Sequence, residues 1–177
     1  INSLRVSGTE VLMTSLAQEL SERGCAVYLF PLITPFDKRF QEHLKGKASV
    51  KVLFPNVVEC LDGLFWRING VCQRLLGLSF RDFFLRRYLS RCWRRYGFDV
   101  VVSNTYPADL LCVDLLKEIR TRLVVIDHGA YCNFLATGQP FRSDGLYSAD
   151  VVVAVSQWAR SMITNRFPDL RVSMIYN

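Results

Sequence analysis

Three polar clusters in the sequence have residue types that bind ligands, and each lies where a strand-like run ends or a helix begins. In the most specific one, His128 follows an apolar run and stands between Asp127 and Gly129. An imidazole can donate or accept a hydrogen bond, and glycine lets the backbone turn close to a bound molecule. The cluster predicts a ligand contact by His128. A structural histidine, oriented by Asp127, is the alternative.

The other two clusters are weaker signals. One opens an amphipathic stretch and consists of Gly8, Thr9 and Glu10. The other follows an apolar run and consists of Asn104, Thr105 and Tyr106. With Ser7 before it, the first cluster fits a capping box, so it predicts a helix start as readily as a ligand site. In the second cluster, threonine and tyrosine residues such as Thr105 and Tyr106 more often cap a helix or pack in the core than bind a ligand.

Short runs rich in Val, Ile and Leu alternate with helical stretches, which predicts the α/β class with a mostly parallel sheet. The expected strands are Ala26–Phe30, Val50–Phe54, Asp99–Ser103, Leu123–Asp127, Val151–Val155 and Val172–Tyr176. Another strand is expected before Ile1 or clipped by it. We expect about six or seven strands, covered by helices on both faces in three Rossmann-like layers. Ligands in such sheets lie beyond the carboxyl ends of the strands, where the three clusters should meet.

Capping residues set the expected limits of the helices between these strands. Gly24 is a natural C-cap for the first. Pro107 suits the first turn of a helix running to about Ile119. Ser156 begins another helix, and Pro168 stops it.

The stretch between the second and third of these strands is longer than one helix and predicts two, Val57–Leu76 and Ser79–Tyr96. The second is amphipathic, with an apolar face of Leu85, Leu89, Cys92 and Tyr96. Its opposite face is basic and carries Arg87, Arg91, Arg94 and Arg95. A solvated face is the default reading. Of the two binding readings, contact with an anionic membrane ranks first and nucleic acid ranks last, because no recognition motif accompanies the arginines.

Composition sets the remaining limits. The 177 residues suit one domain, and half of them are hydrophobic. The net charge is +6, and eight arginines lie between Arg67 and Arg95, where Asp82 is the single acid. The six cysteines form no C-x-x-C pair and there are only two histidines, so we expect no metal site and a reducing, cytoplasmic setting. Neither a membrane span nor a secretory signal is expected.

Four segments, taken in order, resemble the acceptor-side half of retaining GT-B glycosyltransferases. They are Gly8-Thr9-Glu10 with Arg23-Gly24-Cys25-Ala26-Val27, then Phe98–Ser103, Ala149–Ser156 and Val172–Asn177. With His128-Gly129, they resemble the large family that builds lipid-linked glycans, polysaccharides and lipopolysaccharide. The resemblance implies that residues 1–177 form the N-terminal Rossmann-like domain, and that a donor-binding domain lies outside the chain.

The resemblance also implies roles for particular residues. Gly8 and Thr9 would lie against the donor phosphates, with Ser7 where the family has the first of two glycines. His128 would contact the transferred sugar. Glu10, Asn104, Thr105, Tyr106, Asp127 and Gly129 would line the crevice. The nucleotide-sugar would be a substrate, so no cofactor or metal is implied. The acceptor would be a glycan or a lipid-linked sugar, reached at the inner face of the membrane by a cytoplasmic or peripheral enzyme. The chain alone would be inactive.

Two other classes compete with this reading. A dinucleotide-dependent oxidoreductase needs G-x-G-x-x-G at the first helix and an acid after the second strand, and both are missing here. A non-catalytic Rossmann-like adaptor, docking through the basic helix, fits the same pattern. The gene beyond Asn177 discriminates, because an enzyme requires a second domain there.

Overall fold

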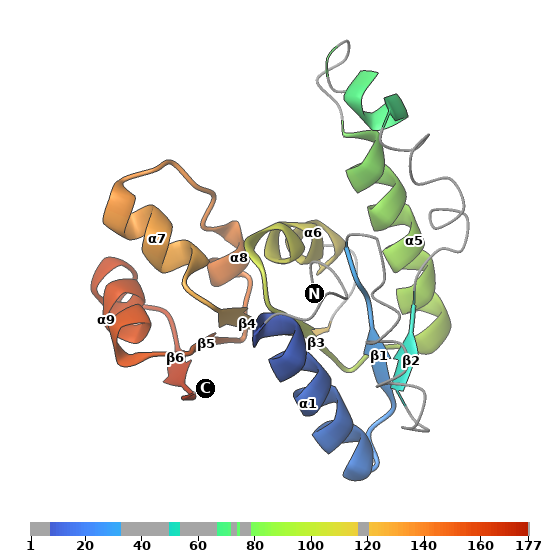
Figure 1. The fold of residues 1–177 in the computed structure, drawn as a ribbon, viewed down its shortest axis with the longest axis horizontal. Coiled ribbons are helices and arrows are strands. Elements are labelled where there is room, and N and C mark those ends of the chain that lie inside the picture. Colours follow the sequence, from blue (N-terminus) through green and yellow to red (C-terminus); the bar gives the residue numbers. More distant parts are fainter. Residues whose placement is uncertain are drawn as a thin grey trace. The chain divides into compact units, whose positions relative to one another are not determined.

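The computed structural model of the chain describes residues 8–32, 50–53, 67–71, 74, 79–116 and 121–176. The chain divides into two compact units, Ile1–Gly97 and Phe98–Asn177. All pairs among the described strands are parallel (Figure 1). The predicted α/β class, with parallel sheets and flanking helices, is therefore confirmed. Among the described residues, the six expected strands pair within a two-stranded and a four-stranded sheet.

The first unit opens with helix α1 (Gly8–Glu22), which ends as the sequence predicts. Gly24 adopts φ +85°, a left-handed conformation that suits glycine. The N–H of Cys25 then donates to the carbonyl of Leu20 at 3.0 Å, and the N–H of Gly24 donates to Ser21 at 3.0 Å. These two bonds form a Schellman motif, which satisfies carbonyls that the helix end would leave open.

Strands β1 (Val27–Leu29) and β2 (Val50–Val52) form the small sheet of this unit. Helix α1 contacts both strands. Met13 and Ala17, one turn apart on α1, are buried, as expected for the apolar stripe of an amphipathic helix.

Helix α5 (Phe80–Tyr96) closes the first unit and is capped at both ends. The backbone N–H of Asp82 donates to the hydroxyl of Ser79, the N-cap, at 3.2 Å. At the other end, Gly97 adopts φ +61° and its N–H donates to the carbonyl of Trp93. The predicted helix is thus confirmed within one residue.

The two faces of α5 differ as the sequence predicts. Of the predicted apolar face, Leu85, Leu89 and Cys92 are buried, and Tyr96 is half-buried. Trp93, which was not part of the predicted face, is also buried. The exposed face carries Arg86, Arg87, Arg91, Arg94 and Arg95. Of the other predicted helix, Val57–Leu76, residues 67–71 and 74 are helical, and the rest lies outside the described residues.

The second unit is built on a four-stranded sheet in the order β3-β4-β5-β6. Its strands are β3 (Val100–Ser103), β4 (Arg122–Asp127), β5 (Val151–Ala154) and β6 (Val172–Met174). Strand β5 pairs on both sides, so its predicted place in the interior of the sheet is confirmed. Because neighbouring strands follow one another along the chain, right-handed crossovers place the connecting helices on one face of the sheet.

Four helices make these connections. They are α6 (Tyr106–Leu116), α7 (Ala130–Thr137), α8 (Asp144–Tyr147) and α9 (Gln157–Arg166). The contacts of α6 with α8 and of α7 with α9 form a helical layer. The hydroxyl of Ser156 accepts from the N–H of Ala159 at 3.1 Å, which confirms the predicted cap of α9. The expected end of α6 at Ile119 lies outside the described residues.

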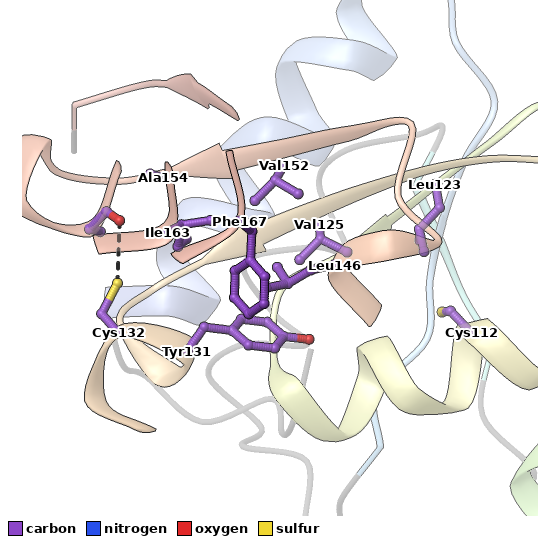
Figure 2. Close-up of a cluster of buried hydrophobic side chains, with 11 residues drawn as sticks. Cys112, Leu123, Val125, Tyr131, Cys132, Leu146, Val152, Ala154, Ile163 and Phe167 are labelled. Atoms are coloured by element: carbon purple, nitrogen blue, oxygen red, sulfur yellow. Dashed lines mark hydrogen bonds between the residues drawn. The ribbon is translucent and has the colours of Figure 1, made fainter. Parts of the chain in front are cut away.

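The hydrophobic core of this unit lies between the sheet and its helices (Figure 2). Side chains alternate along a strand, so Leu123 and Val125 point to the same face. With Val152 and Ala154 of β5 they meet a helical side of the core made of Tyr131, Cys132, Leu146, Ala159, Ile163 and Phe167. On the other face of the sheet, Ile126 is also buried, as the continuous apolar run predicts.

Gly145 of α8 provides a test of how tightly this layer is packed. A Cβ atom there would lie 2.5 Å from the Tyr131 hydroxyl and 2.8 Å from the Cβ of Asp109. We expect Gly145→Ala to lower the free energy of unfolding by about 1–3 kcal/mol, the usual range for overpacking. Urea unfolding measures it. Gly70→Ala is the control, since nothing lies within 4 Å of its added Cβ. Equal stability of wild type and Gly145→Ala would contradict the packing described.

Candidate functional site

The carboxyl ends of β3 and β4 form the candidate site of the second unit. Ser103 pairs with Val125 in the parallel register, so Asn104 leaves the sheet beside Ile126. Asp127 ends β4, and His128 begins the loop that follows. Two of the predicted clusters therefore meet at the same edge of one sheet, where ligands of parallel α/β proteins bind.

Asp127 holds the loop after β4 in place. Its Oδ1 accepts hydrogen bonds from the backbone N–H groups of Gly129 at 3.0 Å and Tyr131 at 3.2 Å. Its Oδ2 accepts from the thiol of Cys132 at 3.2 Å. The side chain is 2% exposed, so the carboxylate is committed to its own loop and to the start of α7.

His128 lies in the turn that these bonds fix. Gly129 adopts φ +102°, which a residue with a side chain rarely does, and it is the N-cap of α7. His128 as a whole is half-buried, and its Nε2 atom is buried. The imidazole is therefore held at the sheet edge by a turn of defined geometry.

A buried carboxyl group on α6, Asp109, was missed by the sequence analysis. It is 1% exposed; its Oδ1 accepts from the hydroxyl of Ser103 at 2.5 Å, and its Oδ2 from the hydroxyl of Tyr131 at 2.9 Å. Burial raises the pKa of Asp109 to about 7, against the lowering effect of these two bonds, and the nearby charge of Asp127 raises it further. The signal available in the sequence was an acid in the first turn of an apolar helix, three positions before Cys112.

Asn104 is the most deeply buried of the predicted site residues. The side chain is 1% exposed. Neither its Nδ2 nor its Oδ1 has a hydrogen-bond partner within the described part of the chain. Buried amides nearly always have partners, so this one requires an explanation.

Tyr106 makes contacts through both its ring and its hydroxyl within the second unit. Its ring contacts Tyr131 and Phe134, with centroids 5.5 and 5.0 Å away. Its hydroxyl accepts from the backbone N–H of Arg142 at 2.8 Å. The backbone carbonyl of Thr105 accepts from the N–H of Asp109 at 2.9 Å, which begins α6. These contacts fit the capping and packing alternative that the sequence left open.

The first cluster belongs to the other unit. Gly8, Thr9 and Glu10 form the first residues of α1, which fits a helix start. Their side chains, and Ser7 before them, lie outside the described part of the chain. Among the described residues, no group of three or more His, Cys, Asp or Glu side chains is placed to hold a metal ion. Nor does any described helix have the length and apolar character needed to span a membrane.

The sequence of nearly the whole chain matches a family model. Residues 6–177 match the model described as Glycosyltransferase Family 4. The chain belongs to this glycosyltransferase family. The glycosyltransferase resemblance noted in the sequence is thereby confirmed at the level of the family.

Solved structures give the fold of this family-4 chain a second line of support. Two structures of Anabaena HepE, one in complex with UDP and glucose and one with UDP-glucose, both align with a TM-score of 0.62. Sequence identity is 18% and 16%, and the alignments cover 100% of this chain and 42% of HepE. The chain therefore has the fold of somewhat less than half of that protein. A search of the curated proteins gave no match.

The raised pKa of Asp109 predicts a pH dependence of stability. The carboxyl has a pKa of about 7 in the folded chain against an ordinary value of 3.8. Between these values the folded state holds the extra proton, so the free energy of unfolding should fall as pH rises towards 7 and level off above it. We expect Asp109→Asn to remove a slope worth on the order of 2 kcal/mol between pH 5 and pH 8.

Urea unfolding at several pH values measures this slope. Asp169→Asn is the control, because Asp169 is exposed in the same unit and should leave the wild-type slope unchanged. A slope that persists in Asp109→Asn would assign the titration to another group.

Proposed function

We propose that the chain is the acceptor-side, N-terminal half of a retaining GT-B glycosyltransferase. The full protein would transfer a sugar from a nucleotide-sugar to a glycan or a lipid-linked acceptor. The family match over residues 6–177 carries the proposal. It is supported by the likeness to HepE, which is described in complex with UDP-glucose and of which the chain spans 42%. Transfer would require a second, donor-binding half, so residues 1–177 alone would be inactive.

In this proposal His128 contacts the transferred sugar. Its turn is fixed before any ligand arrives, because Asp127 accepts hydrogen bonds from the backbone N–H groups of Gly129 and Tyr131. A positioned imidazole can hydrogen-bond a sugar hydroxyl in either sense. Orientation by a preformed group lowers the barrier more than uniform binding does, because little has to be reorganised during the reaction.

The donor phosphates are assigned to the start of α1. A helix N-terminus presents backbone N–H groups and a partial positive charge to an anion. Gly8 and Thr9 begin this helix, and glycine permits close approach of a phosphate to the backbone. Glu10 follows them in the first turn as a crevice residue.

His128→Ala tests the sugar contact in the full-length protein. We expect turnover to fall by about 10²-fold or more, the scale for losing one positioned polar group. The melting temperature should change little. Asn133→Ala is the matched control, because Asn133 is exposed on the neighbouring helix α7. A structural histidine would give the reverse pattern, a clear loss of melting temperature with near-normal turnover per folded molecule.

The exposed face of α5 favours a peripheral membrane contact, either for the enzyme or for a non-catalytic adaptor. Five arginines are exposed along it. Phe83, on the same helix, is 66% exposed. Basic side chains near an anionic surface contribute about 1 kcal/mol each, and an exposed aromatic ring suits the membrane interface. The adaptor differs from the enzyme in one respect: it would lack sugar transfer altogether.

Sedimentation with anionic vesicles tests this contact. A variant with Arg87, Arg91, Arg94 and Arg95 all changed to Gln should bind at least tenfold more weakly than wild type. The control changes four exposed arginines of the second unit to Gln: Arg122, Arg160, Arg166 and Arg171. Binding by wild type should also weaken as salt rises. Equal losses in both variants would mean that net charge alone, and not α5, governs binding.

A further inference from the structure

The amide of Asn104 differs from the two buried carboxyl groups at the edge formed by β3 and β4. Asp109 and Asp127 are just as buried, and each carboxylate accepts hydrogen bonds at both oxygens. Asn104 is 1% exposed, and neither atom of its amide has a partner among the described residues. An unmade hydrogen bond of this kind destabilises a protein, whereas an apolar side chain of similar shape would not. A fold optimised only for stability would not keep it.

The position of Asn104 points to a ligand. It is the first residue after β3, and the parallel register places it beside Ile126, immediately before the Asp127–Gly129 loop. The side chain thus lies at the edge where His128 is held. Functional groups at such sites often remain unsatisfied until a ligand supplies the missing partners.

The hydrogen-bonding groups of the Asn104 amide restrict the class of ligand. Nδ2 needs an acceptor and Oδ1 needs a donor. A phosphate oxygen would satisfy Nδ2 and repel Oδ1, and an acyl chain would satisfy neither. Two neighbouring hydroxyl groups of a sugar ring satisfy both, because each hydroxyl can donate and accept.

We propose that Asn104 binds a sugar ring through a pair of hydroxyl groups, with Oδ1 accepting from one and Nδ2 donating to the other. This assignment rests on the proposed glycosyltransferase function and makes Asn104 a determinant of which sugar is accepted. The sugar belongs to the donor or to the acceptor. Because the amide is buried, these bonds form after neighbouring atoms move aside.

Asn104→Leu in the full-length protein is the test, since leucine has the same number and branching of side-chain heavy atoms and no polar atoms. Calorimetric titrations use UDP, UDP-glucose, GDP and GDP-glucose as probes, and glucose added to the UDP-saturated protein. We expect unchanged affinity for UDP and GDP, and a melting temperature no lower than that of wild type. Affinity for the glucose-containing probe should fall about tenfold or more, because the sugar hydroxyls lose their partner. Loss confined to the nucleotide-sugars assigns the donor sugar, and loss confined to free glucose assigns the acceptor.

Matched variants keep the test decisive. Asn165→Leu, at an exposed position of α9, should leave all affinities unchanged. If Asn104→Leu does not fold, Asn104→Ala removes the same amide without demanding new space and is titrated with the same probes. Sugar affinities equal to wild type in the folded variant would overturn the inference. So would a large fall in melting temperature with equal losses for UDP and UDP-glucose, which would indicate a structural amide bonded to buried water.

The two proposals fail in distinguishable ways. If wild type binds none of the nucleotides or nucleotide-sugars, the proposed function fails and the assignment of Asn104 falls with it. If wild type binds them and the Asn104 variants bind them equally well, only the sugar contact of Asn104 is wrong.

Discussion

The carboxylate of Asp127 is the interaction on which the candidate site depends. It ends the central strand β4 and accepts from two backbone N–H groups of the loop that follows. These bonds hold Gly129 at its positive φ and fix the start of α7. The parallel pairing of β4 with its two neighbours then sets this loop at a sheet edge. The sheet sets the position of this loop, and the carboxylate of Asp127 sets its local geometry.

Buried polar groups divide into two kinds in this unit. Asp109 is paired with two hydroxyls that come from different elements, β3 and α7, so it ties the sheet to its helical layer. Asn104 is equally buried, but its amide has no hydrogen-bond partner among the described residues. Stability explains why a polar group is buried at Asp109. Ligand binding is the better explanation for the buried amide of Asn104. The contrast matters because both residues look alike to any argument based on burial alone.

Sequence reasoning located the elements well and their tertiary contacts poorly. Runs such as Val151–Ala154 indicate a buried strand. Ser79, Gly97 and Ser156 cap helices through hydrogen bonds to residues close by in the sequence, so these caps can be predicted from the sequence. The same reasoning placed His128 and Asn104 at strand ends, because that requires only the strand limits. It missed Asp109, whose burial depends on residues 22 and 36 positions later, and it could not decide between packing and binding for Tyr106.

The unequal environments of the cysteines have a chemical consequence. Burial raises the pKa of the Cys112 and Cys132 thiols to about 12, and the sulfur of Cys132 lies 3.5 Å from the carbonyl oxygen of Ala159 (Figure 2). Cys92 is buried as well, whereas Cys25 is exposed just after α1. The thiolate is the species that attacks an alkylating reagent, so these buried thiols should react slowly in the folded protein. Among the described cysteines, Cys25 is therefore the natural attachment point for a fluorophore or spin label that reports on the first unit.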